Sequence, residues 1–253
     1  MKHFFYILIV LLSFMFSEAQ NRTLFEEGNA LYNEGKYAEA IDKYMAILET
    51  DKHSPELYFN LGNAHYRLNN VAPSIYYFEK AKLLDPNDRD IENNLAFANN
   101  MTIDAIDNIP EVGFSKFIKN ITHSLNFDAW AKIAVVLAFL YVVLVLLYYL
   151  SYSSGKKRIA FVSSVICLLS LCIVLAFAFN KFELDKKNNP AIVFARESQV
   201  KTEPNLRSEE AFRLHEGTKV QVIDTVNNWK KIKLLDGKTG WIDNEDIKLL
   251  KAF

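Results

Sequence analysis

The chain has 253 residues, 51% of them hydrophobic, and its formal net charge is −1. A nucleic-acid partner is therefore not expected, because neutralising phosphates requires a clustered basic face. The two cysteines, Cys167 and Cys172, lie within one apolar block, so the polar parts of the sequence offer no disulfide framework, cysteine-based zinc site or thiol nucleophile.

The first segment has the pattern of a secretory signal peptide. A short basic region precedes an apolar run over residues 4–16, and the small residues Ser17 and Ala19 follow it. The run is shorter than the roughly 20 apolar residues that a helix needs to span a bilayer. We therefore expect residues 1–19 to be cleaved off rather than to remain as an anchor.

The next segment contains an internal repeat. Residues 28–30 (Gly-Asn-Ala) recur 34 positions later at residues 62–64, and the aromatic Tyr44 recurs as Phe78. This period, with a small residue and an aromatic residue at those positions, resembles the tetratricopeptide repeat, whose units are pairs of antiparallel helices. The resemblance implies an all-α domain over residues 20–103, made of two repeats and a capping helix.

In such repeats the first helices line the concave face of the stack. Polar and aromatic residues occupy the corresponding positions here: Phe25, Asn29, Tyr32, Asn33, Phe59, Asn63, Tyr66 and Arg67. Asparagine amides can hydrogen-bond an extended peptide backbone, and aromatic rings can form pockets for its side chains. We expect a peptide-binding groove. In the alternative interpretation, Asn29 and Asn63 only form hydrogen bonds between the repeats.

Residues 104–127 have the apolar spacing of an amphipathic helix, with Phe117 and Ile121 on one side and Lys116 and Lys119 on the other. Such a connector fits two placements, on a membrane surface or against the repeats.

Two long apolar segments follow. Residues 133–150 and 159–179 carry no charged side chain, and the stretch between them ends in Lys-Lys-Arg. We expect a transmembrane hairpin in contact with lipid, with helices over 128–150 and 159–179 and a polar cytoplasmic loop over 151–158. A linker over 180–189 completes this part.

The last segment, residues 190–253, shows short strand signals rich in branched and aromatic residues. Asp236-Gly237 predicts a two-residue hairpin with a type I′ turn. The order of Trp229, this turn and Gly240-Trp241 resembles a bacterial SH3-like domain, which implies a small all-β barrel that binds peptide or cell-wall material or serves as a spacer. Trp229 and Trp241 are candidates for its ligand face, and Trp241 fits a place in the core equally well.

Enzyme motifs are absent from the sequence. Gly237-Lys238-Thr239 resembles the end of a phosphate-binding loop, but the glycine required at position 232 is Ile232. The histidines are scattered, and no sequence motif of a metalloprotease, serine hydrolase or dinucleotide-binding fold occurs. We therefore expect no catalytic residue, no metal and no cofactor.

The whole order of signal peptide, two repeats, two spans and SH3-like tail resembles the BatE family of the bacterial aerotolerance operon. The resemblance implies a non-enzymatic scaffold for protein–protein interactions in a cell-envelope complex. The implied partners are envelope proteins that carry von Willebrand A-type domains, alongside a MoxR-type ATPase.

The expected location is the bacterial inner membrane, with both soluble domains facing the periplasm, because a cleaved signal peptide and two spans place both on the outer side. An alternative function is the binding of peptidoglycan or wall peptides through the SH3-like domain. A wall hydrolase is the third possibility, and it lacks a nucleophile and metal ligands in the sequence.

Overall fold

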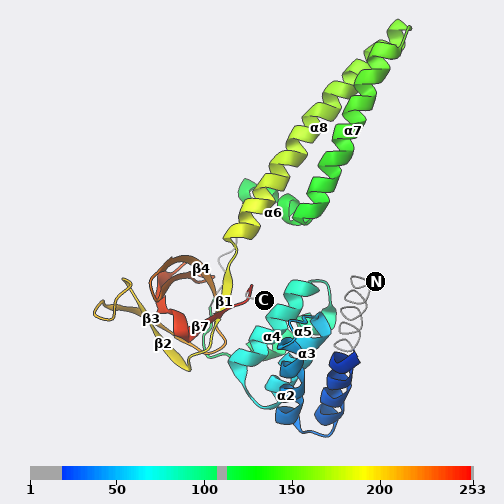
Figure 1. Cartoon of the computed structure of the whole chain (residues 1–253). Helices are drawn as coiled ribbons and strands as arrows, with labels where there is room; N and C mark the ends of the chain where they lie inside the picture. The colour runs from blue at the N-terminus through cyan, green and yellow to red at the C-terminus, as the bar shows by residue number, and fades with distance from the viewer. Residues whose placement is uncertain (1–18, 107–112, 252–253) are drawn as a thin grey trace, which may run out of the picture. The chain divides into compact units, whose positions relative to one another are not determined.

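The structure is a computed structural model that describes residues 19–106 and 113–251 (Figure 1). The chain divides into two compact units: Met1–Asn108 together with Asn189–Phe253 form one, and Ile109–Asn188 form the other. The expected signal peptide lies outside the described residues except for Ala19, so its cleavage stays a prediction.

The N-terminal part of the first unit, here called the repeat domain, is a stack of antiparallel helices, as the 34-residue period predicts. Ser54 and Asp88 act as N-caps of two of these helices, accepting hydrogen bonds from the backbone N–H groups of Leu57 and Ile91. Its helices are residues 19–33, α2 (Tyr37–Leu48), α3 (Pro55–Arg67), α4 (Val71–Leu84) and α5 (Arg89–Asn99).

Two glycines explain why the repeat motif has a small residue and an aromatic residue. A Cβ atom on Gly28 would lie 2.5 Å from Tyr44 Cε1, and one on Gly62 would lie 2.7 Å from Phe78 Cδ1. In each repeat the ring therefore packs directly on the backbone of the preceding helix. Tyr44 and Phe78 are both 1% exposed, and each anchors one of the two apolar clusters of the stack.

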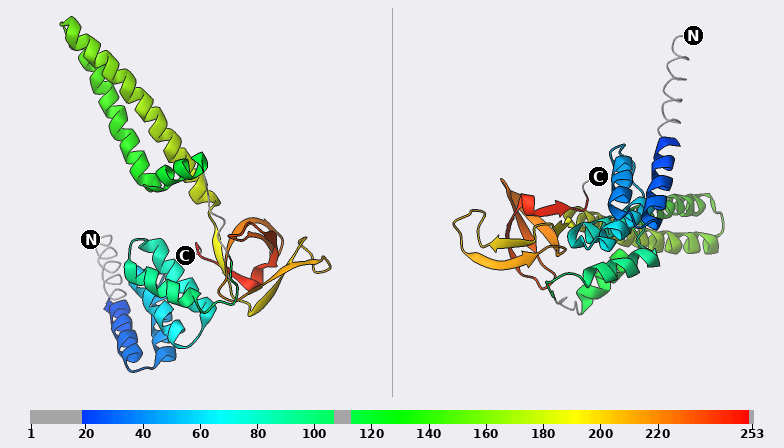
Figure 2. Two further views of the ribbon diagram at one scale, coloured as in Figure 1. Left: turned by 180° about the vertical axis from the view of Figure 1, so that it is seen from behind. Right: turned by 90° about the horizontal axis from the view of Figure 1, so that it is seen from below.

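The second unit is a helical hairpin with a short helix before it. It comprises α6 (Phe114–His123), α7 (Phe127–Leu150) and α8 (Ser154–Lys187). The helices α7 and α8 lie side by side along their length (Figure 2), and their buried positions are mostly small: Ala134, Ala160, Ser164, Cys167 and Ala178. Small residues let two helices approach closely, as they do in lipid.

Both long helices are long enough and apolar enough to cross a membrane, and each contains an 18-residue stretch with a mean hydropathy of 2.8. Helix α7 alone, at 24 residues, would span about 36 Å at the usual rise of an α-helix. Large apolar side chains such as Phe139 and Phe179 are 72% and 68% exposed, which suits contact with lipid rather than water.

The hairpin differs from the expected boundaries at both ends of its second helix. Helix α8 begins at Ser154, so only residues 151–153 of the expected polar loop are non-helical. It then continues to Lys187 through the segment expected to be a linker, where Lys181 pairs with Asp185 at 2.7 Å one turn apart.

The connector helix α6 belongs to this unit and contacts α8. The Trp130 Nε1 atom at the start of α7 donates to the carbonyl of Thr122 in α6 at 3.2 Å.

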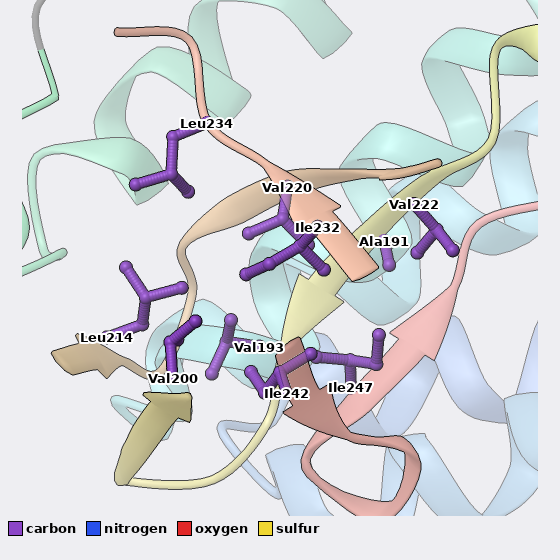
Figure 3. Close-up of a cluster of buried hydrophobic side chains, with 10 residues drawn as sticks. All are labelled: Ala191, Val193, Val200, Leu214, Val220, Val222, Ile232, Leu234, Ile242 and Ile247. Atoms are coloured by element: carbon purple, nitrogen blue, oxygen red, sulfur yellow. The ribbon is translucent and has the colours of Figure 1, made fainter. Parts of the chain in front are cut away.

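The C-terminal part of the first unit, here called the β domain, is one curled antiparallel sheet with the order β3-β2-β6-β5-β4-β1-β7 (Figure 1). Its strands are β1 (Pro190–Val193), β2 (Glu197–Lys201), β3 (Glu210–His215), β4 (Lys219–Val226), β5 (Trp229–Lys233), β6 (Thr239–Asp243) and β7 (Ile247–Leu249). Ten apolar side chains fill its core, contributed by every part of the sheet (Figure 3).

The predicted type I′ turn at Asp236-Gly237 is wrong. Gly237 has φ +87°, whereas Asp236 does not have positive φ as that turn requires. The N–H of Gly237 donates to the Leu234 carbonyl at 3.0 Å, and the N–H of Leu234 donates to the Lys238 carbonyl at 2.9 Å. The connection is therefore a longer loop in which only the glycine adopts the left-handed conformation.

Candidate functional site

The repeat domain contains a polar cavity of about 320 Å³ on the face formed by its first helices. It is lined by Asn29, Tyr32, Asn33, Tyr44, Asn60 and Asn63. Four of the eight residues expected in the groove gather here: Asn29, Tyr32, Asn33 and Asn63. Four amide side chains thus surround one opening, each offering both a donor and an acceptor.

Asn29 is held by hydrogen bonds within the repeat domain. Its Oδ1 accepts from Tyr44 Oη at 2.7 Å and from Asn60 Nδ2 at 2.9 Å. Burial, followed by the proximity of Tyr32, raises the pKa of Tyr44 to about 12, so the hydroxyl remains a donor at neutral pH. Asn29 therefore joins the first helix to α2 and α3, and its hydrogen bond with Asn60 links the two repeats, as the alternative interpretation expects for this residue.

Asn63 occupies the equivalent position in the second repeat, but it makes no hydrogen bond through its side chain to any residue that the structure describes. Asn33 is likewise unbonded within the described part of the chain, and it is exposed. These two amides are available to a ligand that enters the cavity.

Arg67 does not line the cavity itself, but it contacts Tyr32, which does. Its Nε donates to Tyr32 Oη at 3.4 Å, and this hydrogen bond raises the pKa of the guanidinium, which stays charged. The side chain is exposed and forms no ion pair with any described residue. A guanidinium of this kind can bind a carboxylate with two parallel hydrogen bonds.

The structure places the remaining groove candidates elsewhere. The ring of Phe25 lies 5.9 Å from that of Tyr44, and Phe25 lines a separate cavity of about 570 Å³. The ring of Phe59 lies 5.8 Å from that of Phe78 and packs between the apolar clusters of the stack. Tyr66 is 36% exposed and lines neither cavity.

Two residues of the cavity were not among the expected groove residues. Asn60 precedes Asn63 by one helical turn, so the spacing along α3 was a usable signal. Tyr44 was noted in the sequence only as the aromatic residue of the repeat motif, and the polar end of its ring reaches the cavity while the rest is buried.

The outer face of the β domain carries the other candidate residues. Strand pairing places Lys231 opposite Trp241 and Trp229 opposite Asp243, so the two tryptophans are diagonal neighbours. The Lys231 ammonium lies 5.7 Å from the Trp241 ring, within the range of a cation–π contact. Both tryptophans are half-buried, and neither belongs to the core.

No metal site is evident in the part of the chain that the structure describes, where no three His, Cys, Asp or Glu side chains cluster. Within the same residues, the thiols of Cys167 and Cys172 both lie in α8.

Comparisons with known families match both the repeat domain and the β domain. Residues 28–69 match the TPR repeat family, residues 55–88 match the tetratricopeptide repeat family, and residues 198–248 match the bacterial SH3 domain family. Members of these families are typically non-catalytic. No curated protein sequence matches the chain.

Among solved structures, the first TPR of Spaghetti (RPAP3) bound to the HSP90 peptide SRMEEVD is similar at 23% identity, over 32% of this chain and 92% of that one, with a TM-score of 0.24. The NMR structure of the first TPR domain of the human RPAP3 protein is similar at 22% identity, over 32% and 91%, with a TM-score of 0.23. The family matches and the described helices and strands together identify TPR repeats at the N-terminal side, two long apolar helices, and a bacterial SH3 domain at the C-terminal side.

Proposed function

We propose that this protein is a membrane-anchored, non-enzymatic scaffold whose repeat domain holds an extended segment of a partner protein. The observation that carries the proposal is the cavity in which Asn33 and Asn63 have no hydrogen-bond partner among the described residues while Asn29 is fixed beside them. An extended backbone needs donors and acceptors at its binding surface, and unbonded amides supply both.

Arg67 gives the groove a preference for negative charge at one end. A carboxylate on the bound segment, from an acidic side chain or a chain terminus, would meet the guanidinium beside Tyr32. We expect micromolar affinity, near −8 kcal/mol, because two repeats offer only a short groove.

The proposed setting is a cell-envelope complex of the BatE type. The order of TPR repeats, two long apolar helices and a bacterial SH3 domain supports it. In this setting the chain sits in the bacterial inner membrane with both soluble parts in the periplasm, and its partners are envelope proteins with von Willebrand A-type domains.

A second candidate function is the binding of peptidoglycan or wall peptides by the β domain. The observation in its favour is that Trp229 and Trp241 lie on the outer face beside Lys231 instead of in the core. Aromatic rings next to a cation can stack on a ligand and meet its carboxylates at the same time.

The proposed scaffold function is tested by quantitative capture of partners with the full chain purified in detergent. Asn63→Ala and Arg67→Ala are compared with the matched surface substitutions Asn87→Ala and Arg89→Ala, since Asn87 and Arg89 are exposed and lie outside the cavity. Loss of one groove contact should lower affinity by on the order of 1–3 kcal/mol. Equal recovery of the same partners by all four variants and by the unmodified chain would exclude the groove as their binding site.

A further inference from the structure

The repeat domain and the β domain are far apart in the sequence, with the whole hairpin between them, yet they belong to one compact unit. We infer that the β domain is the C-terminal cap of the repeat stack, and that the two form one body on a single side of the membrane.

The apolar contact between them is a shared core. Ile192 of β1 and Leu250, both 0% exposed, join a cluster with residues of α4 and α5 that include Ile75 and Ala98. All four residues of β1 are buried. Because successive side chains of a strand point to opposite faces, Ala191 and Val193 fill the β-domain core (Figure 3), while Ile192 packs on the helices.

The turn between β3 and β4 lies directly on the helices. Gly217 has φ +88°, and a Cβ atom on it would lie 2.9 Å from side-chain atoms of Val71, Ile75 and Thr102. No larger residue fits between this turn and α4 without a shift of one of them. A close approach of this kind is typical of a packed interface and not of two domains joined only by a tether.

Buried polar groups surround the apolar contact. The Asp104 carboxylate, whose side chain is 14% exposed, accepts from the His215 N–H at 2.7 Å, from His215 Nδ1 at 2.7 Å and from Thr218 Oγ1 at 2.5 Å. Burial alone would raise the pKa of Asp104, but these hydrogen bonds lower it. The Glu79 carboxylate, 10% exposed, pairs with the Lys219 ammonium at 2.7 Å.

Aromatic contacts continue across the same boundary. The rings of Tyr76 and Phe194 meet edge to face at 5.4 Å, and Tyr76 Oη donates to the Leu249 carbonyl at 3.3 Å. Within the β domain, the Lys248 ammonium lies 4.3 Å from the same Phe194 ring. None of the residues in this boundary lines the polar cavity, so the groove stays open when the β domain is docked.

Two consequences follow for the molecule. A repeat stack needs its last apolar face covered, and here the β domain covers the face of α4 and α5. Segments that pack together must also lie on the same side of a bilayer. The residues between the two domains therefore cross the membrane an even number of times, and this holds for either side of the membrane on which the two domains lie.

The first test is chemical crosslinking of the full chain in lipid vesicles, with Cys167 and Cys172 replaced by serine. Glu79→Cys is combined either with Lys219→Cys or, as a matched control, with Lys238→Cys in the β5–β6 loop, and a short thiol-to-thiol crosslinker is added. We expect an intramolecular crosslink for the first pair at a yield at least tenfold above the control. Equal yields, or a crosslink that joins two chains, would overturn the single-body inference.

The second test measures sidedness and does not depend on the crosslink. Single cysteines replace the exposed residues Asn87 and Asn205 in the same background, and an impermeant thiol reagent is added to sealed vesicles of uniform orientation. Both cysteines should react from the same side. Reaction from opposite sides would contradict the inference, whatever partner the groove binds.

Discussion

At the residue scale, the two repeats use equivalent asparagines for different purposes. In the first repeat the packed aromatic residue is Tyr44, whose hydroxyl donates to Asn29. In the second repeat the equivalent residue is Phe78, which has no hydroxyl, and Asn63 stays without a hydrogen bond among the described residues. The hydrogen bonds from the Tyr44 hydroxyl and the Asn60 amide therefore distinguish Asn29, which supports the fold, from Asn63, whose amide is open to a ligand.

This difference predicts opposite effects of two equivalent substitutions. Asn29→Ala leaves the Tyr44 hydroxyl and the Asn60 amide without their acceptor, and should lower the free energy of unfolding by about 1–3 kcal/mol. Asn63→Ala removes no internal hydrogen bond and should stay within about 0.5 kcal/mol of the unmodified chain. The change in the free energy of unfolding is measured for each variant by chemical denaturation of the full chain in detergent, with hydrogen exchange of the repeat helices as the readout.

Equal destabilisation by the two substitutions would mean that Asn63 also supports the fold. This result would contradict the proposal that its amide is available to bind a partner. The substitution Tyr44→Phe is the internal control. This substitution removes the donor of the same hydrogen bond instead of its acceptor, so it should also lower the free energy of unfolding.

The sequence could predict part of this site and not the rest. The repeat period predicts the concave positions, and four of the residues at these positions, Asn29, Tyr32, Asn33 and Asn63, line the cavity. Phe25 has the same period but lines a different cavity. Periodicity assigns a residue to a helix face, but the size of the neighbouring side chains decides whether it reaches the opening.

At the scale of the elements, strand β6 presents its two faces to different surroundings. Ile242 is 0% exposed in the core of the β domain (Figure 3), whereas the adjacent Trp241 lies on the outer face, half-buried and beside Lys231. Alternation along the strand separates a core residue from a candidate ligand contact.

The two substitutions in β6 should therefore differ. Ile242→Ala should cost about 2–5 kcal/mol of stability, the usual range for emptying a core position, whereas Trp241→Ala should cost about 1 kcal/mol or less. If the β domain binds wall material, Trp241→Ala should also reduce co-sedimentation of the full chain with purified peptidoglycan. Hydrogen exchange of residues 190–250 measures the stability of the β domain. If Trp241→Ala lowered this stability as much as Ile242→Ala does, the Trp241 ring would belong to the core.

The elements that the sequence predicted best were those with a long, uniform signal. The apolar helices followed from their length and lack of charge, and the repeat helices followed from the 34-residue period, whereas β2 and β3 carry little signal of their own. Strand β2 alternates charged or polar residues with Ser198 and Val200 and has few branched side chains, so its conformation depends on pairing with β3 and β6. The β5–β6 turn was predicted incorrectly because loop length, and not the Asp-Gly pair alone, selects the turn type.

At the scale of the whole molecule, the sequence suggested two separate soluble domains over residues 20–103 and 190–253. The structure joins them through Asp104, Gly217 and the outward side of β1. No local pattern could reveal this contact, because each residue looks like ordinary loop or strand sequence until the two segments come together. A partner held in the groove would then be fixed relative to the outer face of the β domain.

The central claim is that the groove of the repeats holds a partner segment, and site-specific photo-crosslinking in native membranes tests it most directly. A photoreactive phenylalanine derivative replaces Asn33, which is exposed at the cavity, or Asn87, which is exposed outside it. We predict that a defined partner protein crosslinks to position 33 and not to position 87, and that adding Asn63→Ala or Arg67→Ala abolishes most of the adduct. The same adducts from both positions, or an adduct at position 33 that neither substitution reduces, would contradict the account.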